Sequence, residues 1–377
     1  MAVESTPAPL DLEATPPEVK RYQRQKLQAG IAGTMVSFIW LAVFAFVAGP
    51  ELGRQTAEWF AGNDWIRLLV TALTLGVTLE VLTLPLDFWS GFILEHRYQL
   101  SNQRLGGWVW KHVKGMLLGG VLGIALLYGL YAVLWWTGAW WWLWATAGWL
   151  AVTLLLGRLL PVVILPLFYT VRRLDDGELV DRLRRLTEGT TLTVEGVYEL
   201  KLSDETRKAN AALAGLGRTR RVLLGDTLLS QFTNEEIEVV FAHEVGHHVH
   251  RHLPKLVVAG VLLALAGFAL VDLVLGALAP RLGYAGLADP AALPLLALVL
   301  GVFGLLLSPV QNAVSRFFET QCDRYALLKT GNASAYRSAF IKLARINKAD
   351  PDPHPLIAWL FYDHPPIRER LALADSV

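Results

Sequence analysis

One stretch of the sequence organises the rest of the chain: Phe241-Ala-His-Glu-Val-Gly-His-His-Val-His250. It contains His243, Glu244 and His247 in the spacing H-E-x-x-H. Residues four apart lie on one face of an α-helix, so a helix here brings both imidazoles within reach of one metal ion. Three protein ligands and a water make a catalytic zinc site, in which Glu244 can take the proton of that water. The motif therefore predicts a helix that binds one Zn²⁺ per chain.

The residues just before the motif predict where its helix begins. Thr233-Asn-Glu-Glu236 has the pattern of a capping box, in which the first and last side chains bond each other's backbone amides. An apolar stripe at helical spacing follows, made of Ile237, Val240 and Phe241. His243 therefore falls in the third turn of a helix with a defined start. The alternative is a surface helix whose histidines match the spacing by accident.

Three more histidines follow the motif, at positions His248, His250 and His252. They lie off the helix face that carries His243 and His247. We therefore expect solvated or interfacial side chains at these three positions, and we do not include them among the metal ligands.

A third zinc ligand has to come from elsewhere, and a carboxylate is usual when two histidines come from this motif. The segment Ser315-Arg-Phe-Phe-Glu-Thr-Gln-Cys-Asp-Arg-Tyr-Ala326 supplies Glu319, on a helix that follows the last apolar run. Asp323 lies one turn further on the same face, where it can accept a proton from a zinc-bound histidine. On spacing alone, both carboxylates could equally pair with Arg316 along an exposed helix. Cys322 lies one residue off this face, and we expect a small buried thiol there.

The composition separates this chain from soluble globular proteins. Hydrophobic residues make up 54% of it and charged residues 18%, where about half and about a quarter are usual. The apolar residues gather in runs of about 20, the length that spans a bilayer core. A net charge of +1 gives no nucleic-acid footprint, and a single cysteine excludes an intramolecular disulfide. We therefore expect a multi-pass membrane protein that binds no nucleic acid.

Six apolar runs predict six membrane-spanning helices, at about 29–49, 66–86, 115–136, 140–170, 256–279 and 292–312. Pro161 and Pro166 interrupt the fourth run, so we expect a kink there. The segment between the fourth and fifth runs is charged and mixed in pattern, which predicts a soluble α/β unit.

The runs divide the chain into five parts. These are a disordered, basic tail at 1–28; four transmembrane helices with a cytosolic loop 87–114 at 29–170; the α/β unit with the H-E-x-x-H helix at 171–255; two transmembrane helices at 256–312; and a polar, helical part at 313–377. Nearly all Lys and Arg residues fall in parts on one side of the membrane, which the positive-inside rule assigns to the cytosol. We therefore expect both termini and the motif to face the cytosol.

The sequence resembles the type I CAAX prenyl proteases, a family of integral-membrane zinc metallopeptidases related to the bacterial membrane protease HtpX. The matching motifs cover most of the chain beyond the tail. They are Leu84-Pro85, Glu95, Pro166-Leu-Phe168, Asn210-Ala211, Arg221-Val-Leu-Leu-Gly-Asp-Thr-Leu-Leu229, the H-E-x-x-H stretch, Ser315-Arg-x-x-Glu-x-x-x-Asp323 and His364-Pro365. The chain length favours the prenyl-protease branch over the shorter HtpX type. The loop after the second run lacks the Gly-Phe-Asn of eukaryotic members, which favours a bacterial member.

The resemblance implies a ligand set and a fold. Glu319 becomes the third zinc ligand beside His243 and His247, with Asp323 supporting a histidine ligand. The fold class that follows is mainly α: a polytopic membrane protein with about six transmembrane helices and a cytosolic, zincin-like α(+β) metallopeptidase domain. In this family the spans enclose a water-filled chamber that opens at the zinc.

The resemblance also implies roles that spacing does not show. Asn210, on an expected edge strand, would hold the substrate backbone, as strand addition predicts. His364 would donate to the developing oxyanion, although its position alone indicates only a structural loop histidine. Arg368 would line the same site. Glu244 would be the general base.

The function expected from the sequence is that of a membrane-embedded zinc endopeptidase that cleaves prenylated, CAAX-type or other membrane-associated peptides. The first alternative is an HtpX-like protease for the quality control of membrane proteins. The second is no enzyme: a six-span transporter or scaffold with a regulatory metal site, suggested by the intramembrane charges Glu80 and Arg158. The expected partners are a peptide or protein substrate, lipidated or not, and the bilayer. We expect a monomer in the inner membrane of a bacterium, or in the ER membrane of a eukaryote.

Overall fold

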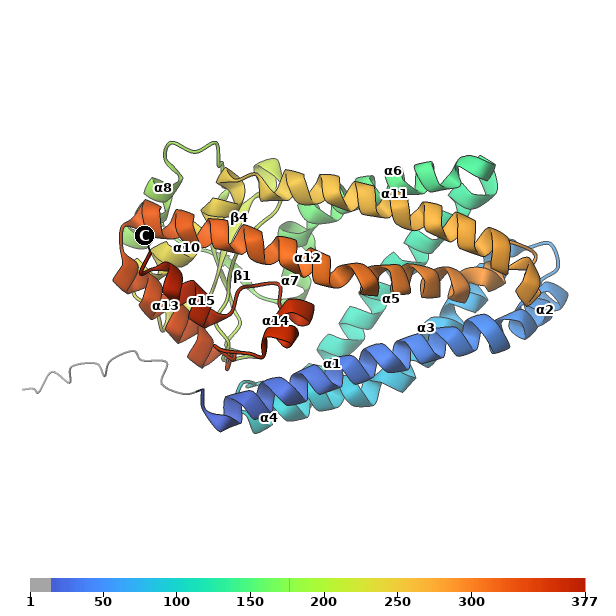
Figure 1. The fold of residues 1–377 in the computed structure, drawn as a ribbon, viewed down its shortest axis with the longest axis horizontal. Helices are drawn as coiled ribbons and strands as arrows, with labels where there is room; N and C mark the ends of the chain where they lie inside the picture. Colours follow the sequence, from blue (N-terminus) through green and yellow to red (C-terminus); the bar gives the residue numbers. More distant parts are fainter. Residues whose placement is uncertain (1–14, 176, 377) are drawn as a thin grey trace, which may run out of the picture.

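Long helices and a small α/β unit lie at opposite ends of an elongated molecule (Figure 1). The structure is a computed structural model that describes residues 15–175 and 177–376. The longest helices form the bundle: α1 Pro17–Val43, α3 Asp64–Phe88, α5 Leu105–Thr137, α6 Trp141–Leu159, α11 His252–Leu278 and α12 Leu293–Thr330. Shorter helices complete it: α2 Gly49–Trp59, α4 Leu94–Arg97 and α7 Leu165–Phe168.

Five helical stretches of the described chain are long and apolar enough to cross a membrane. They are Pro17–Trp59, Asp64–Arg97, Leu105–Phe168, His252–Leu278 and Pro290–Thr330. The third stretch holds two of the six predicted spans, α5 and α6, because the chain turns between them at Gly138, whose φ is 54°. The mainly α, polytopic fold class is therefore confirmed.

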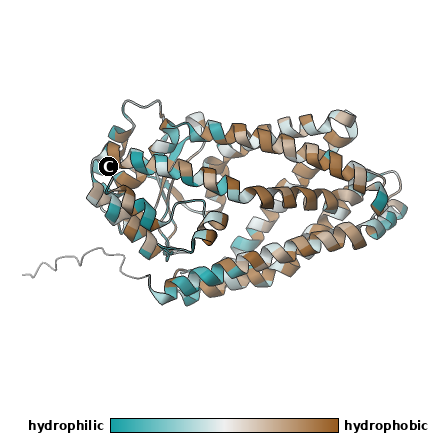
Figure 2. Ribbon diagram, viewed as in Figure 1, coloured by the Kyte–Doolittle hydropathy of each residue, from teal (hydrophilic) through white to brown (hydrophobic). Residues whose placement is uncertain are grey.

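Most residues of these helices are apolar (Figure 2), and many of their large apolar side chains are exposed. Leu273 on α11 and Leu306 on α12 leave 72% and 73% of their surfaces exposed. Contiguous apolar surface of this kind is unfavourable in water and natural against lipid tails. Charged groups inside the bundle instead face other helices: Glu80 lies 2.6 Å from His112 of α5, and Asp272 accepts a hydrogen bond from Trp141 Nε1 at 2.7 Å.

The fourth predicted span is interrupted where its prolines indicated. After α6 the backbone changes to a π-helix at Leu160–Ile164 and returns to α geometry in α7. Pro161 has no N–H to donate to the preceding turn, so the α-helical ladder cannot run through it. Two more π-helices, Phe44–Ala48 and Trp89–Ile93, extend α1 and α3.

Three predicted boundaries are wrong, for one shared reason. The tail 1–28 is helical from Pro17 onward, while residues 1–14 lie outside the described residues. The loop 87–114 is also mostly helical, since α4 follows α3 and α5 begins at Leu105. The boundary at 312 falls inside α12, which is continuous. Apolar runs measure only the part of a helix that matches the bilayer, and these helices continue into protein contacts beyond it.

The segment 171–255 forms the predicted α/β unit. Its four strands are β1 Val171–Arg173, β2 Gly196–Leu200, β3 Ala211–Ala214 and β4 Arg221–Gly225, in the sheet order β1-β2-β4-β3. β2 and β4 are parallel, with Val197 opposite Val222, and β3 pairs antiparallel with β4, with Leu213 opposite Val222. β3 therefore has one free edge.

Helices cover this sheet and surround the motif helix. They are α8 Glu178–Thr187, α9 Asp226–Leu229, α10 Asn234–Val249, α13 Ala333–Ile346, α14 Pro355–Phe361 and α15 Ile367–Leu373. One buried cluster joins Leu224 of the sheet to Phe241 and Val245 of α10. The glycine of the motif brings the membrane helix close: a Cβ on Gly246 would lie 3.0 Å from the Cα of Cys322 on α12. α10 is thus packed between the sheet and α12.

Candidate metal centre and active site

The motif helix α10 begins with the predicted capping box. Thr233 Oγ1 accepts from the Glu236 amide at 3.3 Å, and Glu236 Oε2 accepts from the Thr233 amide at 2.8 Å. Glu236 is buried and also receives hydrogen bonds from Lys342 at 2.7 Å and from Ser338, both on α13. The start of α10 is therefore fixed from two sides, which sets the position of His243 three turns later.

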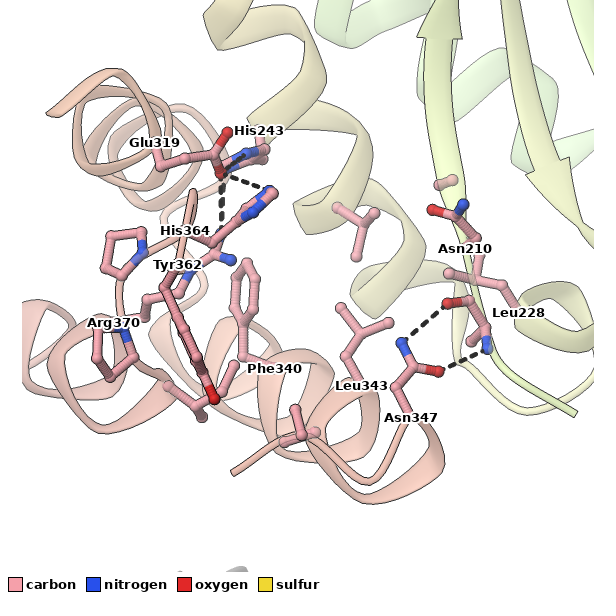
Figure 3. A pocket seen from close by; sticks show the side chains of 18 of the residues that line it. Asn210, Leu228, His243, Glu319, Phe340, Leu343, Asn347, Tyr362, His364 and Arg370 are labelled. Atoms are coloured by element: carbon pink, nitrogen blue, oxygen red, sulfur yellow. Dashed lines mark hydrogen bonds and ion pairs between the residues drawn. The ribbon is translucent and has the colours of Figure 1, made fainter. Parts of the chain in front are cut away.

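Three side chains from two helices converge beside α10. His243 Nε2 lies 3.0 Å from Glu319 Oε2, and His247 Nε2 lies 3.2 Å from Glu319 Oε1. The structure thus brings together the two motif histidines and the carboxylate that we expected as ligands (Figure 3 shows His243 and Glu319). His243 and Glu319 are both buried, with 6% and 5% of their surfaces exposed.

The chemistry of this cluster fits a cation. Glu319 Oε2 is buried and makes no hydrogen bond with any described residue, although His243 Nε2 is 3.0 Å away. Burial lowers the pKa of His243, but the carboxylates of Asp323 and Glu319 outweigh this and raise it to about 9. The cluster therefore concentrates negative charge at a point that two imidazole nitrogens also face. Two histidines and one carboxylate form an established donor set for catalytic Zn²⁺.

Cys322 is the other candidate for the third ligand. Its sulfur and one nitrogen each of His243 and His247 lie within 4.8 Å of one another. The sulfur, however, lies 3.6 Å from His252 Nδ1, on the side of His247 that faces away from Glu319. The Nε2 atoms of both histidines face Glu319, which therefore fits the third position better. Cys322 is completely buried, as predicted for a small apolar side chain.

Asp323 and Arg370 hold His243 from behind. Asp323 Oδ1 lies 2.9 Å from His243 Nδ1, in the place that its spacing predicted. Arg370 donates to both oxygens of Asp323, from Nε at 2.8 Å and from Nη2 at 2.6 Å, and packs over Phe340 at 3.9 Å. The imidazole is thus fixed with its Nε2 directed at Glu319.

Arg370, which was not predicted as a site residue, lines the site where Arg368 was expected. The Arg368 side chain is 57% exposed and pairs with Asp352 at 3.3 Å, so the structure does not bring it to the site. On the α-helix α15, residues two positions apart lie on nearly opposite faces, so only one of the two arginines can point inward. The stripe formed by Ile367, Arg370 and Leu371 at helical spacing was the signal for the correct choice.

His252 has a buried place that was not predicted. The chain reverses after α10 at Arg251, whose φ is 54°, and returns His252 to the motif. Its Nδ1 lies 3.1 Å from His247 Nδ1, its Nε2 lies 2.9 Å from Gln321 Oε1, and only 1% of its surface is exposed. The expectation of a solvated or interfacial side chain is therefore wrong for His252, whereas His248 and His250 are half-buried.

The contacts of His252 give these hydrogen bonds a direction. Gln321 Oε1 only accepts, so His252 carries its proton on Nε2 and accepts on Nδ1. His247 then donates from Nδ1, which leaves its Nε2 unprotonated toward Glu319. Because support of this kind is usually worth about 10- to 100-fold in metal affinity, we expect His252→Ala to weaken zinc binding by that factor. The affinity is measured by competition with a chelator.

The matched control for this prediction is His250→Ala. His250 stacks on His252 with ring centroids 5.6 Å apart, and its ring does not hydrogen-bond His247. We expect the control to bind zinc as the unchanged protein does. Equal zinc affinities of the two variants would show that His252 does not support the ligand.

Glu244 and the free edge of β3 lie next to each other. Glu244 Oε2 accepts a hydrogen bond from the Leu213 amide at 3.3 Å. Asn210 directly precedes this strand, and its carbonyl accepts from Gly225 of β4 at 2.9 Å. The expected edge strand therefore runs past the carboxylate of the motif.

His364 faces the same cluster from the loop before α15. Its Nε2 lies 3.5 Å from Glu319 Oε2, and its Nδ1 lies 2.8 Å from Asp363 Oδ1. The hydrogen bond that His364 donates to the Asp363 carboxylate raises the pKa of His364. The side chain remains 54% exposed, so it borders the opening of the site.

A cleft of about 370 Å³ opens between α10, α13 and the start of β3 (Figure 3). His243, Glu319 and His364 lie on one side of it and Asn210 lies across from them. Glu244 also lines the cleft. The remaining wall is mainly apolar, formed by Leu228, Val240, Phe340 and Leu343. A peptide that enters this cleft meets the cluster, the free strand edge and an apolar surface together.

Comparison with known proteins agrees with this geometry. The profile of peptidase family M48 matches residues 173–377, which is more than half of the chain. The chain belongs to peptidase family M48. The profile described as "CAAX prenyl protease N-terminal, five membrane helices" matches residues 11–170 of this M48 peptidase.

Named relatives cover most of this M48 peptidase. A Bacillus subtilis protein described as "Uncharacterized metalloprotease YhfN" is 28% identical, over 89% of this chain and 80% of its own length. The "CAAX prenyl protease 1 homolog" of Arabidopsis thaliana is 29% identical, over 79% and 70%. The crystal structure of S. mikatae Ste24p superposes with a TM-score of 0.82 at 22% identity, over 95% of this chain and 88% of that one, which shows a shared fold.

Family membership decides between a protease and a transporter or scaffold, the two classes of protein that the sequence left open. An M48 peptidase is a metalloprotease, so the transporter or scaffold alternative is set aside. The family implies a metal ion, generally zinc, and a peptide substrate. Together with the apolar helices, the match to the amino-terminal membrane region makes the chain a multi-pass integral membrane protein.

Proposed function

We propose that this M48 peptidase is a zinc endopeptidase that cleaves membrane-associated peptides, with prenylated CAAX-type peptides as the first candidates. The observation that carries the proposal is the convergence of His243 Nε2 and His247 Nε2 on Glu319, next to Glu244 and a free strand edge. A structural metal site would need neither the neighbouring carboxylate nor the strand edge.

The metal and its three ligands provide the first part of the mechanism. Zn²⁺ held by His243, His247 and Glu319 would polarise the scissile carbonyl and acidify a water molecule. Glu244 takes a proton from that water molecule while the water oxygen bonds to the carbonyl carbon. The same carboxylate then gives this proton to the amide nitrogen, as the carbon–nitrogen bond breaks and the amine leaves.

His364 and β3 provide the second part. The Nδ1 of His364 is held by Asp363, which leaves Nε2 to donate toward the oxygen on which negative charge develops. The substrate backbone adds to the free edge of β3 as an extended strand, held at its end by Asn210. The apolar wall of the cleft then receives an apolar side chain near the scissile bond.

The substrate class is supported by the relatives and by the membrane bundle. Several relatives carry the name CAAX prenyl protease 1, and the chain matches the membrane region described for such proteases. Proteolysis of misfolded membrane proteins, in the manner of HtpX, is the second candidate, because the apolar helices embed this peptidase in the same bilayer as such substrates. All the proposed catalytic groups come from one chain, so a monomer suffices.

The distribution of Lys and Arg supports a cytosolic catalytic end and cytosolic termini. The membrane is then the inner membrane if the source is a bacterium, and the ER membrane if it is a eukaryote. The assignment of the cytosolic side depends only on the positions of Lys and Arg, so it does not depend on the substrate.

The test is the cleavage of a farnesylated CAAX peptide by the detergent-purified protein, beside the same peptide without the lipid. Glu244→Gln serves as the blank. We expect cleavage of the prenylated peptide, because its lipid would partition into the detergent layer around the apolar helices and bring the peptide to the protein. Equal cleavage of both peptides would contradict a requirement for prenylation and favour a broad protease of membrane proteins. Cleavage of neither by a zinc-loaded protein would overturn the proposed substrate class.

A further inference from the structure

The first turns of α1, Pro17–Lys26, contact the chain segments on both sides of the substrate cleft, although the helix goes on to form part of the membrane bundle (Figure 1). We propose that this segment is a brace that sets the width of the cleft at its Asn210 end. The proposal rests on the proposed function only in taking the cleft as the place where the substrate binds. It assigns a positioning role to residues that lie outside the peptidase segment 173–377.

One side of the cleft, which we call the strand rim, is the segment 206–210 that leads into β3. Lys208 in this rim pairs with Glu95 Oε2 at 2.9 Å and donates to the hydroxyl of Tyr22 at 3.0 Å. Tyr22 in turn donates to Glu95 Oε1 at 2.8 Å, and Lys26 pairs with the same oxygen at 2.8 Å. Tyr22 and Glu95 expose only 2% and 8% of their surfaces. The strand rim is thereby tied to α1 and α4 by a network in which two partly exposed lysines pair with the buried Glu95.

The other side, which we call the helix rim, is the segment 347–350 after α13. Gln23 on the brace donates from its side-chain amide to the carbonyl of Lys348 at 2.5 Å. The Lys348 ammonium pairs with Glu18, at the beginning of the brace. Lys348 has a φ of 49°, a backbone conformation that a non-glycine residue holds only when its surroundings fix it. The brace supplies two of the contacts that fix it.

The two rims also bond each other at the end of the cleft. Asn347 accepts from the Ala209 amide at 2.9 Å and donates to the Ala209 carbonyl at 3.1 Å, as Figure 3 shows. Asn347, Ala209 and Asn210 all line the cleft. Ala209 is next in sequence to Lys208, and Asn347 is next to Lys348. The brace contacts both of these lysines. The contacts of α1 with both rims therefore set the distance across the cleft beside Asn210.

A positioning role and a purely structural role lead to different results. If the brace only adds stability, weakening it lowers the unfolding temperature and leaves substrate binding unchanged in the folded protein. If it sets the cleft, weakening it raises KM while kcat and zinc content stay the same, because the metal ligands lie on α10 and α12. The separate values of KM and kcat distinguish the two roles.

The chain offers a matched pair of glutamines for this test. Gln23 bonds the helix rim, whereas Gln25, two residues further on the same helix and similarly half-buried, accepts from Tyr98 at 3.0 Å. We compare full-length Gln23→Ala with Gln25→Ala, using the peptide that the unchanged protein cleaves. Tyr22→Phe is the second variant: it removes the hydroxyl that Lys208 of the strand rim contacts, and it leaves both lysines paired with Glu95.

Two readouts are taken for each variant, steady-state kinetics and hydrogen exchange of backbone amides in 206–212 and 347–350. We expect Gln23→Ala and Tyr22→Phe to raise KM about 3- to 10-fold, the effect of losing one hydrogen bond, with kcat and zinc content unchanged. We also expect faster exchange in the rim segments. Gln25→Ala should match the unchanged protein in both readouts.

The proposal is overturned if Gln23→Ala and Tyr22→Phe match Gln25→Ala in KM and in the exchange of both rims. It is also overturned if the loss of activity is in kcat or zinc content instead. Failure of the proposed function gives a different result, since the unchanged protein then cleaves no peptide. The exchange measurement needs no substrate, so it still decides whether the first helix holds the two rims.

Discussion

Glu244→Gln is expected to abolish peptide cleavage while the protein keeps its zinc. The substitution retains the size of the side chain and the contact with Leu213, but an amide cannot take the proton from water. Loss of the general base costs about 10²- to 10⁴-fold in turnover. The ligands His243, His247 and Glu319 are unchanged, so the metal content should stay at one zinc per chain. Turnover is measured with the cleaved peptide, and zinc by elemental analysis of the same sample.

The matched control is Glu238→Gln, which makes the same chemical change on the same helix. Glu238 lies outside the cleft and pairs with Arg182 at 3.3 Å. We expect its turnover to stay close to that of the unchanged protein. Near-normal turnover in Glu244→Gln would refute the mechanism, and loss of zinc in that variant would mean that Glu244 has a role in binding the metal.

Arg370→Ala is expected to produce the largest loss of stability. Asp323 exposes 1% of its surface and receives two hydrogen bonds from Arg370, so the variant leaves a buried carboxylate without its main partner. Breaking a buried ion pair in this way costs about 3–5 kcal/mol. The cation over Phe340 is lost as well. The change is measured as the shift of the thermal unfolding midpoint in detergent.

Arg368→Ala is the control for this prediction, since it removes the same side chain two positions earlier. Its partner Asp352 is 59% exposed, and exposed ion pairs contribute about 0–1 kcal/mol. We expect its midpoint to stay near that of the unchanged protein. Equal shifts for the two arginines would mean that the pair with Asp323 is not what stabilises the site.

The parts of the site that lie on single helices could be predicted from the sequence. The spacing of His243 and His247 fixes their common face, and the capping box at Thr233 fixes where the turns begin. The spacing of Glu319 and Asp323 places them on one face in the same way, although only the resemblance to a known family favoured Glu319 as a ligand over a member of a surface ion pair. Helical periodicity is local, so it needs no knowledge of the rest of the fold.

The parts that depend on a change of chain direction could not be predicted. His252 reaches His247 because Arg251 adopts a left-handed conformation between two helices, and no local pattern marks that turn. Arg370 was missed because the stripe of α15 that favours it over Arg368 does not by itself show that this face meets Asp323 on α12. The start of α1 was missed because Tyr22 is buried by Glu95 and Lys208, which lie far away in the sequence.

The unbroken course of α12 has a consequence for where a substrate can be cut. The helix is 38 residues long, and Glu319 lies roughly 40 Å along it from Leu293, at about 1.5 Å per residue. A bilayer core is about 30 Å thick, so with Leu293 at one boundary Glu319 stands only about 10 Å beyond the other. An extended peptide covers that height in roughly three residues. With the bilayer in this position, the proposed zinc site stands at headgroup level, and we expect cleavage within a few residues of the lipid anchor of a substrate.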